Sequence, residues 1–232
     1  VENLVGKPRR SVIEKAYDVL SLPPEFIPFM QGNPKDPDFI NAFHYLTKTR
    51  GITKYDILKY NMGYCDKGSY AGMILVPSYD DNGQLNFFTG RTYYSDSSFK
   101  HKNPKVTKDI IGFDLHVNWN EPITIVEGAF DAIAVKRNAI PLFGKKMMNV
   151  LKTKIINSQI KRINIALDTD AITDALEMCE YLITNGVEVR LVEMKDKDPS
   201  ELGFATVTQY INTSVPLTAS LLMQKKIIGS FI

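Results

Sequence analysis

Apolar side chains recur at three- and four-residue spacing in the first part of the chain, and this pattern predicts two helices. One helix covers residues 36–50, where Asp36 can cap the first turn. A shorter helix covers residues 53–61. Thr53 is its expected cap, and Asp56 stands three residues later, as in a capping box.

Beyond these helices the pattern changes to that of strands. Residues 73–79 and 85–94 are rich in aliphatic and aromatic side chains, and the turn sequence Asp81-Asn82-Gly83 separates them, which predicts a β-hairpin. The helices and the hairpin form an expected α+β N-terminal subdomain over residues 35–120. The preceding residues 1–34 contain several prolines and are expected to form a linker.

From Pro122 onward, short apolar strands alternate with amphipathic helices. Strands are expected at residues 122–126, 139–143, 162–167 and 187–193, and helices at residues 129–138, 147–156 and 171–185. This alternation is typical of a mainly parallel, here four-stranded, sheet flanked by helices. The fold class is therefore α/β, with this sheet in residues 121–203. Residues 204–232 form a C-terminal helical segment that Pro216 interrupts.

Composition changes this picture little. The chain has 232 residues, of which 44% are hydrophobic and 23% charged, as in ordinary globular proteins. No apolar run approaches the roughly 18 residues of a membrane span. We therefore expect a cytoplasmic protein (in the host cytoplasm if a phage encodes it) with no membrane partner. Cys65 and Cys179 lie far apart, so we expect free thiols and no zinc site in this chain.

The distribution of charge says more than the net charge of +2. Between Asp131 and Asp168 there is no acidic residue but eight basic ones, and residues 91–108 hold five Lys or Arg against Asp96 alone. Such local excess suits a polyanionic partner such as nucleic acid, although a solvated basic face is the simpler alternative for either stretch.

Acidic residues follow three of the predicted strands. Glu127-Gly128 comes after the first, Asp168-Thr169-Asp170 after the third, and Asp196-Lys197-Asp198-Pro199 after the fourth. The carboxyl ends of parallel strands meet at one edge of a sheet, so these groups converge. Clustered carboxylates repel one another, and a hard cation such as Mg²⁺ or Mn²⁺ offsets that repulsion. Paired ions of this kind catalyse phosphoryl transfer.

Each of these residues has a plainer interpretation. An acidic residue after a strand often only caps the next helix. Asp131 lies four residues after Glu127 and could form hydrogen bonds without binding metal. The coincidence at three strand ends is what favours a metal site over three unrelated caps.

The same residues resemble a known pattern. Ile125-Val-Glu127-Gly128-Ala-Phe-Asp131, Leu167-Asp168-Thr-Asp170 and Asp196-Lys-Asp198-Pro199 are similar to the toprim motifs of primases, topoisomerases and some nucleases. Upstream segments are similar to those of DnaG-type primases, and the short form of the chain is most like the stand-alone primases of large tailed phages. These segments are Lys48–Tyr64 with its Arg-Gly-Ile start, Ile74–Arg91 with its Asn-Gly turn, Phe99–Pro104, and Lys108–Gly112.

The resemblance implies a DNA primase that makes short RNA primers on single-stranded DNA during phage DNA replication. It would use ribonucleoside triphosphates and two-metal nucleotidyl transfer, extend the RNA primer, and work beside a separate replicative helicase. The implied catalytic residues are Glu127, Asp168 and Asp170. With Asp198 they would bind Mg²⁺ or Mn²⁺, and Asp131 and Asp196 would support them. The residues implied to face template and nucleotide phosphates are Arg50, Arg91, Lys100, Lys102 and Lys108.

The chain departs from the family pattern at two positions. Ser200 stands where many members have an acidic residue, and Thr169 stands where many have glycine. The family's zinc module is absent from this chain, so zinc is expected only in a domain preceding Val1. There is also no P-loop, because Gly144-Lys145-Lys146 lacks the required spacing and hydroxyl.

Three alternative functions share some of these features. A toprim nuclease or topoisomerase would use the same carboxylates, although a topoisomerase also needs a nucleophilic tyrosine in a further domain. A phosphatase with an aspartyl nucleophile would use Asp168-Thr169-Asp170, but such enzymes usually begin their fold with that motif. A non-enzymatic single-strand binder would explain the basic stretches and leave the carboxylates without a role.

Overall fold

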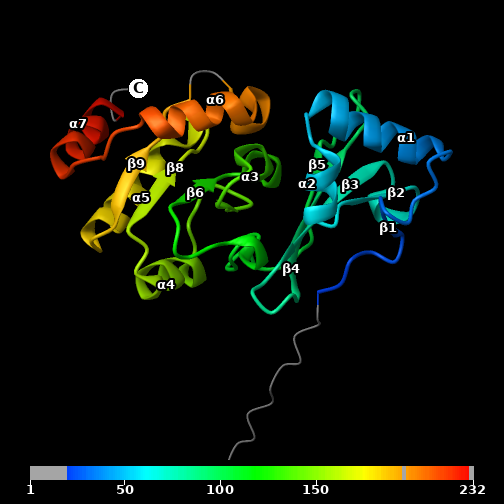
Figure 1. The fold of residues 1–232 in the computed structure, drawn as a ribbon, viewed down its shortest axis with the longest axis horizontal. Coiled ribbons are helices and arrows are strands. Elements are labelled where there is room, and N and C mark those ends of the chain that lie inside the picture. The colour runs from blue at the N-terminus through cyan, green and yellow to red at the C-terminus, as the bar shows by residue number, and fades with distance from the viewer. Residues whose placement is uncertain (1–19, 195–196, 230–232) are drawn as a thin grey trace, which may run out of the picture.

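Two β-sheets lie side by side in the computed structural model, which describes residues 20–194 and 197–229 (Figure 1). The five-stranded sheet has the order β1-β2-β3-β4-β5 and is antiparallel throughout. The four-stranded sheet has the order β7-β6-β8-β9 and is parallel throughout. The strands are β1 Phe26–Pro28, β2 Gly63–Cys65, β3 Met73–Tyr79, β4 Leu85–Thr92, β5 His101–Lys102, β6 Ile123–Val126, β7 Ala139–Pro141, β8 Arg162–Ile165 and β9 Glu188–Leu191.

The helices in the described part of the chain all overlap predicted ranges, although one begins at Pro199, ahead of the expected helical segment 204–232. They are α1 Pro37–His44, α2 Lys54–Lys59, α3 Ala129–Val135, α4 Asn149–Ser158, α5 Ile172–Thr184, α6 Pro199–Thr213 and α7 Ala219–Gly229. Short turns are η1 Tyr45–Thr49, which is π-helical, and the 3₁₀ turns η2 Gly68–Tyr70, η3 Asp114–His116 and η4 Thr169–Ala171. None of these helices is both long and apolar enough to cross a bilayer.

Local sequence signals explain where the first helices begin. The Asp36 carboxylate accepts a hydrogen bond from the Asp38 backbone N–H at 2.8 Å and caps α1. Thr53 and Asp56 form the expected capping box at α2, with reciprocal bonds of 3.2 and 2.9 Å. The expected single helix over residues 36–50 instead ends in the π-helical turn η1, in which the Arg50 N–H donates to the Tyr45 carbonyl at 3.1 Å.

The expected hairpin is confirmed, since β3 and β4 pair across the Asp81–Gly83 turn. The expected linker over residues 1–34 is wrong for residues 26–29. Phe26–Pro28 pairs with β2 as strand β1, and Phe29 is buried against the ring of Phe39. Proline rules out a helix there, but it is tolerated in an edge strand, and β1 lies at the edge of its sheet.

Helices cover both faces of the parallel sheet, as the alternating pattern predicted. Helices α3 and α6 pack on one face, and α4 and α5 pack on the other with α7 beside α5 (Figure 1). The expected break at Pro216 is present between α6 and α7. Helix α6 runs through the expected boundary at residue 203, where Gly203 adopts a φ of +75° and kinks it.

One hydrophobic core runs beneath both sheets. It joins Leu46, Val76 and Phe87 of the N-terminal part to Ile133 and Val207 of the parallel-sheet part. Cys65 and Cys179 are free thiols, as expected, and both are buried, which raises the pKa of each to about 12. The two halves of the chain therefore share this core, which lies beside two further clusters of buried hydrophobic residues.

Phe113 lies where the two halves meet, and we expect Phe113→Ala to destabilise the protein by about 3 kcal/mol. The ring is 1% exposed, and its centroid lies 4.6 Å from that of Tyr60 and 6.0 Å from that of Phe143. Urea unfolding gives the free energy difference. The matched control is Phe99→Ala, because Phe99 is 76% exposed and its loss should cost less than about 0.5 kcal/mol. Equal effects for both variants would contradict the shared core.

Candidate active site

The parallel sheet carries its acidic residues to one edge. Glu127 directly follows β6, and Asp168 lies three residues beyond the end of the adjacent strand β8. The Glu127 Oε1 atom accepts a hydrogen bond from the Asp168 backbone N–H at 3.1 Å, which ties the two strand ends together. The convergence that the sequence predicted is therefore present at these two strands.

Carboxylate oxygens of Glu127, Asp168 and Asp170 all lie within 4.8 Å of one another. Burial, and then the neighbouring charge of Asp168, raise the pKa of Glu127. Burial, and then the charges of Asp198 and Asp170, raise the pKa of Asp168. Among the described residues, only Lys145 forms an ion pair with the cluster, and it pairs with Asp170 at 2.7 Å. The cluster is thus short of positive charge.

A divalent cation fits this cluster. The ligand atoms are carboxylate oxygens, which Mg²⁺ and Mn²⁺ prefer. Within the described residues, the buried Oδ1 atom of Asp168 has no hydrogen-bond partner, and such an atom is costly unless something binds it. A bound cation would satisfy this oxygen and offset the repulsion that raises the pKa values.

Asp131 and Asp198 organise the loops behind the cluster. Asp131 accepts hydrogen bonds from the backbone N–H groups of Gly128 at 3.1 Å and Ser200 at 3.2 Å, in line with the hydrogen-bonding role considered for it. Asp198 caps α6, with its Oδ1 accepting from Glu201 N–H and Ser200 Oγ, each at 2.8 Å. Asp198 lies outside the three-carboxylate cluster, but it lines the adjoining cavity that is described below.

Gly128 is required by this arrangement. A Cβ atom at this position would lie 2.9 Å from Asp131 Oδ2, which is closer than real side chains approach. A larger residue would push away the carboxylate that bonds to the Gly128 N–H. The Glu-Gly pair therefore sets the turn that places Glu127 at the sheet edge.

We expect the contribution of Asp131 to stability to become less favourable as the pH rises from about 4 to about 7. Burial and the charge of Asp198 raise its pKa from the usual 3.8 to about 7. In this window the folded state holds a proton that the unfolded state has lost, so deprotonation at higher pH costs folding energy. The cost applies without divalent cations and amounts to a few kcal/mol.

Urea unfolding in EDTA, from about pH 4 to pH 8, measures this effect. Relative to the wild type, Asp131→Asn should gain stability steadily as the pH rises, because the amide does not titrate. A stability difference that stays constant or falls with pH would contradict the raised pKa of Asp131.

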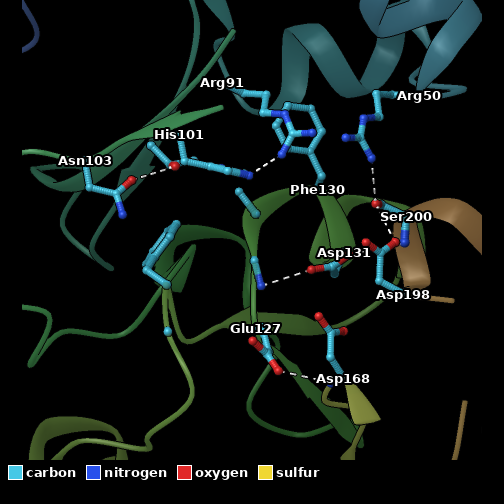
Figure 2. A pocket seen from close by; sticks show the side chains of 15 residues that line it. Arg50, Arg91, His101, Asn103, Glu127, Phe130, Asp131, Asp168, Asp198 and Ser200 are labelled. Atoms are coloured by element: carbon cyan, nitrogen blue, oxygen red, sulfur yellow. Dashed lines mark hydrogen bonds between the residues drawn. The ribbon is translucent and has the colours of Figure 1, made fainter. Parts of the chain in front are cut away.

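A cavity of about 320 Å³ separates two arginines from the carboxylates of Glu127, Asp131, Asp168 and Asp198 (Figure 2). Arg50 and Arg91 come from the N-terminal half and line the opposite wall. No ion pair engages either guanidinium among the residues described. Arg50 is held instead between the rings of Tyr45 and Phe130, at 5.5 and 5.6 Å from their centroids. The positive charges of Arg50 and Arg91 are thus available to an anionic ligand.

The other basic residues expected here lie differently. Lys108 donates to the Phe143 carbonyl at the cavity rim. Lys102 turns away, donating to the Ser69 carbonyl and lying 4.5 Å from the centroid of the Tyr70 ring. Lys100 is exposed and is not part of the cavity lining. Asp196, expected in a supporting position, lies outside the described residues.

The sequence did not single out several residues that the structure brings into this region. His101 and Asn103 line the cavity, and Tyr45 is hydrogen-bonded to Arg91 in its wall. Lys145 forms an ion pair with Asp170 of the carboxylate cluster. Ser200, noted from the sequence only as a departure from the family pattern, also lines the cavity. Removal from water, and then the charge of Arg91, lower the pKa of His101 to about 4, so it is neutral at pH 7 and can accept a hydrogen bond from Arg91. The one available signal was the position of His101 and Asn103 within a primase-like segment.

Taken together, these features define the fold of the catalytic core of DnaG-type primases. No family model matches the chain, and no curated protein is similar to it in sequence. Solved primase structures match it in three dimensions at low sequence identity.

Three of these structures illustrate the match. The DnaG primase catalytic domain bound to single-stranded DNA has a TM-score of 0.70 at 17% identity, over 84% of this chain and 78% of that one. The E. coli primase catalytic core has a TM-score of 0.66 at 16% identity, over 84% and 79%. The Aquifex aeolicus primase structure, with zinc-binding and RNA polymerase domains, has a TM-score of 0.65 at 18% identity. This chain covers 57% of that structure, which covers 79% of this chain.

Proposed function

We propose that this chain is the RNA polymerase core of a DNA primase, which synthesises short RNA primers on single-stranded DNA by two-metal nucleotidyl transfer. One observation carries the proposal. Glu127 and Asp168, which cluster with Asp170 within 4.8 Å, face two arginines across a single cavity, and neither arginine has an ion-pair partner among the described residues. Such a cavity suits a ligand that carries phosphates and binds metal at the same time.

Each wall has a separate task. Glu127, Asp168 and Asp170 would hold divalent cations, and these ions would supply Lewis-acid activation of the attacking hydroxyl and charge stabilisation of the leaving oxygen. Arg50 and Arg91 bind phosphate oxygens of the incoming ribonucleotide and orient its α-phosphate towards the primer 3′ hydroxyl. Pyrophosphate leaves as the new phosphodiester bond forms. Positioning and charge neutralisation supply most of the rate enhancement in such reactions.

Further parts of the proposal rest on the resemblance and on the partners of similar proteins. One structurally similar DnaG domain is bound to single-stranded DNA, which supports a single-stranded template here. A structurally similar primase includes a zinc-binding domain, and zinc would belong to such a domain in this system. We further propose a replication role in a tailed phage beside a separate helicase.

Extension of a short RNA annealed to single-stranded DNA tests the proposal. The reaction contains Mg²⁺ or Mn²⁺ and labelled ribonucleotides, and annealing in advance removes any need for a separate initiation module. We expect templated growth that stalls where the complementary ribonucleotide is withheld. Cleavage of the DNA without growth would move the assignment to a toprim nuclease. If the protein shows no growth and no cleavage, the proposal that this chain is a working polymerase is overturned.

A further inference from the structure

A single phenolic oxygen links the two arginines of the cavity. The Tyr45 hydroxyl accepts a hydrogen bond from Arg50 Nε at 2.9 Å and another from Arg91 Nε at 3.1 Å. Arg50 follows η1, whereas Arg91 lies on strand β4. Tyr45 therefore joins a helical element to the antiparallel sheet at the wall of the cavity.

The π-helical turn makes this link possible. An α-helix has about 3.6 residues per turn, so side chains five residues apart point in different directions. In η1 the Arg50 N–H bonds to the Tyr45 carbonyl at 3.1 Å, and the wider turn brings these two side chains to one side. Such turns are frequent at functional sites.

Each guanidinium is also fixed at a second point. Arg50 Nη1 donates to Ser200 Oγ at 3.1 Å, and Arg91 Nη1 contacts His101 Nε2 (Figure 2). The Nη2 groups of both arginines have no hydrogen-bond partner among the residues that the structure describes. Both side chains are thus held in one orientation while part of each fork stays available for a ligand.

We infer that Tyr45 is a positioning residue that holds Arg50 and Arg91 as a paired cradle for the polyphosphate tail of the incoming nucleotide. This inference rests on the proposed function for the identity of the ligand. Arginine side chains lose much rotamer freedom when they bind phosphate, and a guanidinium that is already fixed loses less. The Tyr45 hydroxyl therefore contributes to affinity without touching the reacting atoms.

Binding of inorganic tripolyphosphate in the presence of Mg²⁺ tests this role without requiring polymerisation. We expect Tyr45→Phe, which removes only the hydroxyl, to raise the Kd for tripolyphosphate about tenfold. The Kd for a short single-stranded DNA should change less than about twofold. In primer extension, KM for the ribonucleotide should rise by the same factor as that for tripolyphosphate while kcat changes little.

Two further variants separate positioning from other roles. Tyr55→Phe is the matched control, because Tyr55 is 71% exposed on α2, outside the cavity, and its substitution should leave binding unchanged. In an Arg50→Lys/Arg91→Lys background no Nε remains to donate to the hydroxyl, so adding Tyr45→Phe should have no further effect.

The inference is overturned by any of three results for Tyr45→Phe: an unchanged Kd for tripolyphosphate, weaker binding of DNA alone, or an equal loss in the lysine background. Loss of folded structure in the variant would also count against it. A wild-type protein that fails to extend primers but binds tripolyphosphate in a Tyr45-dependent way would refute the proposed function and leave the cradle standing.

Discussion

Asp168→Asn/Asp170→Asn should lose templated primer extension by about a thousandfold or more. The two substitutions remove two of the three clustered carboxylates, and with them the cation site on which the proposed chemistry depends. Metal stabilisation of transition-state charge is worth several kcal/mol, and about 4 kcal/mol corresponds to a thousandfold in rate. Single-turnover extension at saturating ribonucleotide measures the loss.

The same variant should be at least as stable as the wild type in EDTA. Burial, and then repulsion by neighbouring carboxylates, raise the pKa of Asp168, so its neutral replacement relieves an unfavourable charge. The matched control is Asp66→Asn/Glu177→Gln, which removes the same charge from exposed positions outside the cavity and should keep full activity. Activity above about a tenth of wild type in the Asp168→Asn/Asp170→Asn variant would place the catalytic metals elsewhere.

Arg50→Ala/Arg91→Ala should weaken binding of a ribonucleoside triphosphate about a hundredfold or more. Hydrogen bonds to charged groups contribute about 1.5–3 kcal/mol each, and the variant removes at least two such contacts together with two positive charges. Equilibrium titration with Mg²⁺ and the triphosphate gives the Kd directly.

The control for this variant is Lys35→Ala/Lys67→Ala, which removes the same charge from exposed positions that are not part of the cavity lining. Long-range attraction alone would make both double variants lose affinity equally, and the loss would vanish at high salt. Direct contact predicts a loss in the arginine variant that persists at high salt. Equal losses would show that the arginines act only as part of a general positive field.

The parallel sheet could be predicted because the sequence signals for its strands and helices lie within the elements themselves. Each strand is a short apolar run, each helix repeats at its own period, and the acidic residues stand directly after the strands. Glu127, Asp168 and Asp170 were found in this way, and the structure brings them together. The order of parallel strands does not alter which ends share an edge, so the site could be inferred without the strand order.

The antiparallel sheet was only partly predictable, because β1 and β2 are short and β1 pairs with a strand that is distant in the sequence. Gly63–Cys65 and Phe26–Pro28 have three residues each, which is too few to show a period. Their partners are set by tertiary packing, on which strand preference depends strongly. The proline-rich start of the chain therefore looked like a linker.

The arginine wall shows a second limit of the sequence. Arg50 and Arg91 were identified as phosphate-facing residues, but nothing in their spacing links them to Tyr45. A regular helix over residues 36–50 would have turned Tyr45 and Arg50 apart, and only the π-helical turn brings them together. The resemblance placed Lys102 in the same group, yet its ammonium group lies over the Tyr70 ring.

The common interior beneath the two sheets bears on how the molecule moves. Phe130 and Phe143 line the cavity and also belong to the core that spans both halves, so the walls cannot separate without exposing buried aromatic rings to water. We therefore expect a cleft of constant width without hinge closure at each nucleotide addition. In such a rigid cleft the charged side chains keep their orientation between turnovers. Translocation then occurs by movement of the nucleic acid past these side chains, without a conformational change of the protein.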